Sequence, residues 1–168
     1  MSIWSERQAE VANLLNPAFC GFLLREAVSS YVSEAGEGMP LSLCFLVLPF
    51  VLHSPTREAL PSSIRTTLLA WLQANPEVRL EFAFRVRSIT PFTREALRFL
   101  IIRELISTDG GILRVGTGNL NNARGLQTRI TSATEEIADC VVRARFLGRW
   151  LALAPDEVTV YNFLGVQP

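Results

Sequence analysis

The side chains best suited to catalysis are scarce in this chain of 168 residues, which contains one histidine and three cysteines. His53 could act as a general base, but a catalytic triad also needs a nucleophile and a carboxylate that orients the ring. The neighbouring Ser54 precedes a proline and is better suited to capping a helix. We therefore interpret His53 as a structural residue, and the sequence predicts no catalytic residue.

Metal and cofactor sites lack their usual patterns as well. Cys20, Cys44 and Cys140 lie far apart among apolar residues, so neither the spacing of a zinc site nor a disulfide framework is present. All 16 basic residues are arginines, which excludes a Walker A lysine and a Schiff-base lysine. The run Gly-Thr-Gly-Asn at 116–119 lacks the third glycine and the following helix of a dinucleotide fingerprint, and predicts a flexible wing loop. The sequence therefore predicts no metal and no cofactor.

A cluster of acids near residue 137 has an ordinary explanation. Glu135, Glu136 and Asp139 fall in the first turns of an expected helix, where carboxylates complement the helix dipole. We expect these side chains to face solvent, with Asp139 and Arg143 forming a stabilising pair four residues apart.

The arginines are candidate contacts with an acidic partner or with phosphate. Basic and acidic residues balance at 16 each, so no net charge draws the chain to nucleic acid. Contact with protein is therefore favoured over contact with backbone phosphate. The candidate contact residues are Arg57, Arg94, Arg98, Arg114, Arg145 and Arg149.

Composition indicates a large core and a partner. Apolar residues make up 49% of the chain and charged residues 19%, which is below the usual quarter. We expect a single domain over 1–168, with residues 1–15 as an N-terminal helix or arm. So apolar a domain favours a permanent partner. Residues 1–10 lack a signal-peptide pattern and the scattered thiols suit a reducing compartment, so we expect a cytoplasmic protein.

The stretch 40–61 is the most informative part of the sequence. Twelve residues from Leu41 to Leu52 carry no charge, whereas a bilayer-spanning helix needs roughly 18 to 20 apolar residues. The stretch must therefore be buried against protein. Its length predicts a helix that kinks or ends near Leu48, ahead of Pro49. The side chains expected in the core are Leu43, Leu46, Val47 and Phe50.

Helix signals cover most of the remaining chain. Asparagine, serine or threonine followed by proline marks several starts, because the side chain caps the helix and proline fits its first turn. The helix from Thr90-Pro91 is apolar around most of its circumference, which predicts the central helix of the fold. The expected helices are 5–15, one from Pro17 to the glycines at 36 and 38, one from Ser54-Pro55, 64–74, 77–88, one from Thr90-Pro91 to Ser107, one from Ala133 to Leu151 capped by Thr131 or Ser132, and one after Pro155-Asp156. Over 77–88 charged and apolar residues alternate, so a strand is the alternative there.

Two short strands are expected after the central helix. Asp109-Gly110-Gly111 is expected to end that helix, followed by strands over 112–115 and 126–130 with a polar loop between them. Helix, turn, strand, loop and strand form a winged-helix-like pattern. The predicted fold class is mainly α, a compact multi-helix domain with a small β-hairpin.

Seven segments carry a family pattern in their order along the chain. They are Asn16-Pro17-Ala18, the stretch 40–61, Leu69-Ala-Trp-Leu72 ahead of Asn75-Pro76, Pro91-Phe-Thr-Arg-Glu-Ala-Leu97, the turn 109–111, Arg145-Phe-Leu-Gly-Arg-Trp150 and Leu164-Gly-Val-Gln-Pro168. This order resembles the middle component of bacterial ABC three-component systems. The resemblance covers the chain from about Asn16 to Pro168, and no catalytic residue carries over because the motifs are structural.

The resemblance implies a non-catalytic adaptor subunit in prokaryotic anti-phage defence. Its implied partners are an ABC ATPase related to the chromosome-maintenance and repair ATPases and an effector, expected to be a nuclease. DNA contact is expected only within that complex, and no membrane contact is expected. The alternative is a winged-helix DNA-binding regulator, although residues 92–106 are too apolar for a recognition helix in a major groove.

Overall fold

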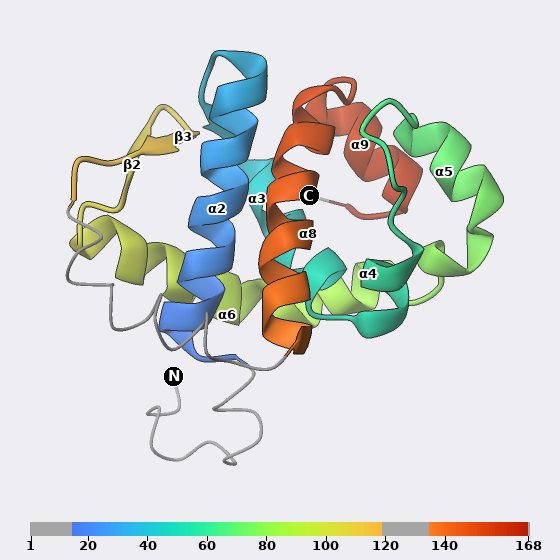
Figure 1. Ribbon diagram of the computed structural model, residues 1–168, viewed down its shortest axis with the longest axis horizontal. Helices are drawn as coiled ribbons and strands as arrows, with labels where there is room; N and C mark the ends of the chain where they lie inside the picture. The colour runs from blue at the N-terminus through green and yellow to red at the C-terminus, as the bar shows by residue number, and fades with distance from the viewer. Residues whose placement is uncertain (1–14, 119–134, 168) are drawn as a thin grey trace.

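The computed structural model describes residues 15–118 and 135–167, so the helix expected over 5–15 lies outside the described residues. The described chain is mainly α-helical with a small antiparallel sheet, which confirms the predicted fold class. Helix α2 (Pro17–Ala35) and helix α8 (Glu135–Ala152) stand side by side and run in the same direction (Figure 1). The chain between them supplies the helices and strands around this pair.

The contact between α2 and α8 depends on a glycine. A Cβ atom at Gly148 would lie 2.1 Å from the carbonyl oxygen of Ala27 and 3.0 Å from the Cβ of Ser30. The two backbones are therefore closer than any larger residue at 148 would allow. Ala144 and Cys140 are buried one and two turns earlier on the same face of α8, so this face carries small residues at successive turns.

Helix α3 (Leu41–Val51) is buried along most of its length, and it lies behind the α2–α8 pair (Figure 1). The helix continues through Pro49 to Val51, so the expected end near Leu48 is wrong. Proline removes one backbone N–H there, but the helix still closes with a 2.9 Å bond from the Leu52 N–H to the Leu48 carbonyl. The four expected core residues are all buried: Leu43, Leu46, Val47 and Phe50.

Helix α6 (Phe82–Ile102) joins two predicted helices into one. The chain before it forms a short 3-10 turn, η2 (Pro76–Arg79), instead of helix from residue 77. The helix continues across Pro91, which lies on the exposed side, where water can satisfy the carbonyl that loses its N–H donor. The helix ends at Ile102 rather than Ser107. It packs on α2 and α3 with one face only, so the expectation that it is the central helix is wrong, and α3 holds that place.

The small sheet has the order β1-β3-β2. Strands β2 (Ile106–Asp109) and β3 (Ile112–Val115) form an antiparallel hairpin, so 109–111 is the hairpin turn and not a helix end. Strand β1 (Met39–Pro40) pairs with the other edge of β3. The strand expected over 126–130 lies outside the described residues, and the winged-helix arrangement therefore stays a prediction.

The glycines at 116 and 118 extend the hairpin. The Gly116 N–H donates to the Leu105 carbonyl at 3.1 Å, and the Gly118 N–H donates to the Glu104 carbonyl at 2.8 Å. A Cβ atom at either glycine would lie within 2.3 Å of a carbonyl oxygen. The two glycines thus permit close backbone pairing at the start of the predicted wing loop, and the rest of that loop lies outside the described residues.

Three short helices lie on one side of α8 in Figure 1. Two of them, α5 and α9, are level with its C-terminal half, and α4 is level with its N-terminal half. Helix α5 begins four residues after the expected start at Ile64, because Thr67 caps it by accepting the Ala70 N–H at 3.2 Å. None of the described helices is both long and apolar enough to cross a bilayer. The three helices are α4 (Ser54–Ala59), α5 (Leu68–Ala74) and α9 (Glu157–Leu164).

Replacing Gly148 with alanine is expected to lower the free energy of unfolding by about 1–3 kcal/mol, because the added methyl group collides with the backbone of Ala27. Equilibrium unfolding in urea measures the change. Ala138→Leu on the exposed side of the same helix is the control and is expected to change stability by less than about 0.5 kcal/mol. A Gly148→Ala variant as stable as wild type would contradict the close contact.

Candidate partner-binding site

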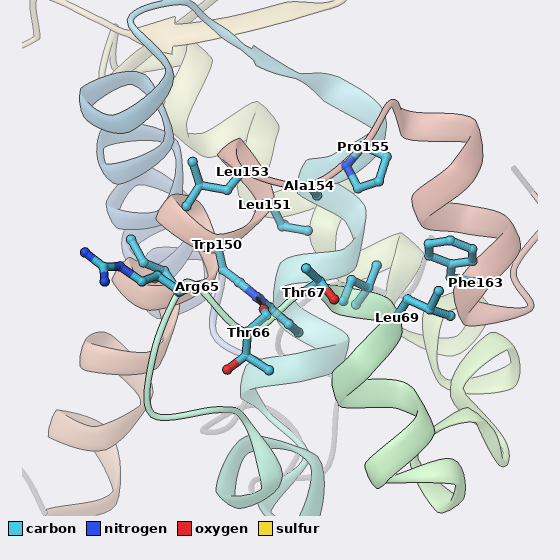
Figure 2. A pocket seen from close by; sticks show the side chains of 12 residues that line it. Arg65, Thr66, Thr67, Leu69, Trp150, Leu151, Leu153, Ala154, Pro155 and Phe163 are labelled. Carbon is cyan, nitrogen blue, oxygen red and sulfur yellow. Dashed lines mark hydrogen bonds between the residues drawn. The ribbon is translucent and has the colours of Figure 1, made fainter.

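An open apolar groove of about 600 Å³ lies between the chain leading into α5, the C-terminal end of α8 and helix α9 (Figure 2). Trp150 is buried at its base. Leu69 and Leu153 line its walls with 46% and 54% of their surface exposed. Phe163 lines it from α9, and Arg65 is the one charged residue among the described residues of its lining. The groove therefore presents large apolar side chains to solvent in a concave arrangement.

Two tryptophans hold one wall of the groove. The indole N–H of Trp150 donates to the Thr66 carbonyl at 2.6 Å, and that of Trp71 donates to the Ala59 carbonyl at 2.6 Å. The two indole rings meet edge to face with centroids 5.2 Å apart. Residues 60–67 between α4 and α5 contain no helix or strand, so these bonds fix a segment that secondary structure does not.

Helix α9 is held by bonds to the start of α3. The Tyr161 hydroxyl donates to the Ser42 carbonyl at 2.6 Å, and the Ser42 hydroxyl bonds to Glu157. Burial, with smaller effects of Cys44 and Glu157, raises the pKa of Tyr161 to about 12, so its hydroxyl stays protonated and keeps donating. These bonds place Phe163 at the groove.

Arg57, a predicted contact residue, is only 4% exposed. Its Nε donates to Asp139 at 2.8 Å, one Nη donates to Glu136 at 3.2 Å, and the other donates to the Val51 carbonyl at 2.8 Å. Burial alone would lower the pKa of Arg57, but the hydrogen bond to Asp139 and the other nearby acids raise it above its ordinary value. Arg57 thus ties α4 and α3 to the first turns of α8.

The two acids therefore do more than face solvent, and that expectation is wrong in part. The Glu136 and Asp139 side chains keep 65% and 40% of their surface exposed while they accept from Arg57. Asp139 also lies 3.6 Å from Arg143, which confirms the predicted pair four residues apart. A buried arginine needs hydrogen-bond acceptors from elsewhere in the chain. The sequence did not indicate that Glu136 and Asp139 accept from Arg57, because they lie about 80 residues away from it.

The other predicted contact arginines fall into two sets. Arg145 and Arg149 lie on one face of α8 and pair with Glu26 and Glu34 of α2 at 2.5 and 3.1 Å, while about half of each arginine remains exposed. Both pairs reinforce the parallel contact between the two helices. The second set is Arg94, Arg98 and Arg114, which are exposed on α6 and β3, away from the groove.

His53 caps helix α4. Its Nδ1 accepts the Thr56 N–H at 3.3 Å and lies 2.8 Å from the Thr56 hydroxyl, so the expectation that Ser54 provides the cap is wrong. The Ser54 hydroxyl instead donates to Glu58. Burial and then the charge of Arg85 lower the pKa of His53, which keeps Nδ1 an acceptor near neutral pH. Thr56 is 2% exposed, so its hydroxyl is not open to a substrate.

A second hollow of about 530 Å³ lies beside His53. It is lined by Arg85 together with Glu77 and Glu81, and the Nε of Arg85 is buried without an acceptor among the described residues. Two carboxylates beside one guanidinium give this hollow a mixed charge. Its described lining includes His53 and Thr56, whose ring and hydroxyl are bonded to each other, but Thr56 is only 2% exposed.

The three cysteines are buried thiols. Burial, with a smaller effect of Glu95 at Cys20, raises the pKa of Cys20 and Cys44 to about 12, and burial also raises the pKa of Cys140. The thiols are therefore neutral near pH 7 and weak as nucleophiles. No three or more His, Cys, Asp or Glu side chains in the described part of the chain are grouped to hold a metal ion.

The described geometry is that of a helical protein with an apolar groove, and its sequence identifies the family. Residues 4–168 match the family described as ABC-three component (ABC-3C) system Middle Component 3. The chain therefore belongs to this family, which gives it an accessory role in an ABC three-component system. It matches no curated protein and no solved structure.

The groove was missed by sequence reasoning. Leu69 and Leu153 adjoin buried apolar residues, Leu68 and Leu151 among them, and read as further core positions. The available signal at Leu69 is its phase, because it is exposed while Leu68, Trp71 and Leu72 form the buried face of α5. Leu153 follows the end of α8 at Ala152 and has no such signal. A single exposed apolar residue is a weak signal alone. Leu69 and Leu153 are 84 positions apart in the sequence, and only the fold shows that they line the same groove.

Replacing Arg57 with alanine is expected to lower the free energy of unfolding by about 2–3 kcal/mol. The change removes the guanidinium donor from the buried Val51 carbonyl and leaves it with the weak bond from the Cys140 thiol at 3.8 Å, whereas the half-exposed acids can be hydrated. Arg149→Ala removes a partly exposed ion pair with Glu34 and serves as the control, with an expected loss below about 1 kcal/mol. Urea unfolding of both variants tests this, and equal losses would contradict the buried role of Arg57.

Stability is expected to fall as the pH rises above the ordinary thiol pKa of 9.0. Burial holds the folded pKa of Cys20 and Cys44 near 12, so the unfolded chain releases protons that the folded chain keeps. Each thiol then removes about 1.4 kcal/mol per pH unit between these values. Urea unfolding across this range measures the slope. Cys44→Ala is expected to reduce the slope by one thiol's share, and an unchanged slope would contradict the assignment.

Proposed function

We propose that this chain is the non-catalytic adaptor of its three-component system. In this proposal it holds an ABC ATPase, related to the chromosome-maintenance and repair ATPases, together with an effector nuclease in the cytoplasm during anti-phage defence. The observation that carries the proposal is membership of the middle-component family over residues 4–168. The open groove supports it, because concave apolar surface is typical of sites that bind protein segments.

The use of the polar side chains supports a role without catalysis. His53 caps a helix, the three thiols are buried and neutral, and the acids near residue 137 accept hydrogen bonds from Arg57. An active site needs a nucleophile or base that substrate can reach. The titratable groups that sequence reasoning singled out instead serve the fold.

The exposed arginines are proposed contacts with the partners. Arg94 and Arg98 on α6 and Arg114 on β3 are open to solvent, on elements away from the groove. An adaptor needs separate surfaces for its two partners, and these residues suit acidic protein surface or, within the assembled complex, DNA phosphate. Arg57, Arg145 and Arg149 are proposed only as secondary contacts, because Arg57 is buried and the other two keep only about half of their surface exposed.

Co-purification of the three co-expressed components tests this proposal. We expect the ATPase and the effector to purify together when this chain is present and to separate when it is omitted, because the chain bridges them. If the two associate equally well without it, the adaptor role is wrong. As a control, the purified chain alone is titrated with duplex DNA at low and high salt, with no binding expected. Tight, salt-dependent binding would favour the DNA-binding regulator instead.

A further inference from the structure

We propose that the groove formed by the chain before α5, the end of α8 and α9 binds an apolar segment of one partner component, flanked by an acidic residue. This inference rests on the proposed adaptor function and adds to it the surface and the chemistry of one contact. The groove's volume of about 600 Å³ falls within the range of binding pockets and suits a few large side chains.

The apolar character of the bound segment follows from the groove lining. Leu69 and Leu153 stay about half exposed on facing walls, with Trp150 at the base and Phe163 at one end (Figure 2). Covering these side chains removes apolar surface from water, which stabilises a complex. Buried aromatic and aliphatic residues in a concave site are the usual centres of binding energy.

The polar groups of the groove favour a protein segment over a small polar ligand. The Thr66 carbonyl already accepts the Trp150 indole N–H, and the Thr67 hydroxyl already accepts the Ala70 N–H. Pockets for small polar ligands present several directed hydrogen-bonding groups. Here two of the polar groups at the base of the groove are occupied by the bonds that shape it.

Charge assigns an acid to the flank of the bound segment. Within the described part of the chain, Arg65 is the one charged residue that lines the groove, and it forms no ion pair there. Its guanidinium lies at the edge and extends away from the groove (Figure 2). An Asp or Glu beside the apolar side chains of the partner would meet Arg65 at this edge, where an exposed pair adds specificity more than affinity.

The groove is preformed, which favours binding. Trp150 packs on Trp71, and Trp71 packs on Phe50 with ring centroids 5.9 Å apart. Phe50 in turn packs on Phe82 at 4.7 Å, so the base of the groove is continuous with the core. Little side-chain freedom is then lost when the partner binds.

Leu69→Asp is the main test variant, and Val158→Asp is its matched control. Leu69 is the second residue of α5 and Val158 is the second residue of α9, and both side chains are exposed. An added carboxylate at either position interacts favourably with the helix dipole. Only Leu69 lines the groove. Arg65→Glu tests the charge, with Arg65→Lys as the variant that keeps it. Thermal unfolding checks that all four variants fold.

The experiment measures the affinity of wild type and each variant for the purified ATPase and for the purified effector of the same system. We expect one of them to bind at least tenfold more weakly to Leu69→Asp and to bind Val158→Asp within about threefold of wild type. We expect Arg65→Glu to weaken the same complex and Arg65→Lys to retain it. A photo-crosslinker at position 153 should link to an apolar segment that contains Asp or Glu.

Each of the following results would overturn part of the proposal. If wild type binds a component and Leu69→Asp binds equally well, the groove assignment is wrong and the adaptor function stands. If wild type binds neither component, both proposals are wrong. Crosslinking to a second copy of this chain would overturn the assignment to a partner component. Unchanged binding by Arg65→Glu would overturn the acidic flank.

Discussion

The backbones of α2 and α8 come together because Gly148 has no side chain, and a Cβ atom there would lie 2.1 Å from the Ala27 carbonyl oxygen. Neighbouring parallel helices cannot be joined by a short turn, so the chain after α2 must return to the starting end before α8 begins. The buried helix α3 lies on that return path and fills the space behind the pair. The direction of α8 also decides where Trp150 and Leu153 emerge, so the groove depends on this helix contact.

Most hydrogen-bonding side chains near the groove are used to shape it. Trp71 and Trp150 hold the chain between α4 and α5, Tyr161 holds α9, and Arg57 ties α4 to α8. What remains open to solvent at the groove is mostly apolar, with Thr66, Thr67 and Arg65 as the polar residues of the described lining. This division fits an accessory subunit of a three-component system, whose work is contact with partners and whose polar groups maintain a fixed surface.

The sequence predicted the elements whose signals are local. Asn16 and Pro17 marked the start of α2, the uncharged run marked the core of α3, and Pro155-Asp156 marked α9. The errors arose where distant packing outweighed a local signal, as at Pro49 and Pro91, which both stay inside helices. The Arg57 network and the groove were not predictable, because each joins residues about 80 positions apart.

The central claim is that the groove is the contact surface of an accessory subunit. Hydrogen–deuterium exchange, measured on the chain alone and bound to a partner component, tests it most directly because exchange reports which backbone becomes covered. We predict slower exchange on binding in residues 64–70 and 150–155, which form the two walls. Slower exchange confined to α6 and the hairpin, with both walls unchanged, would contradict the claim.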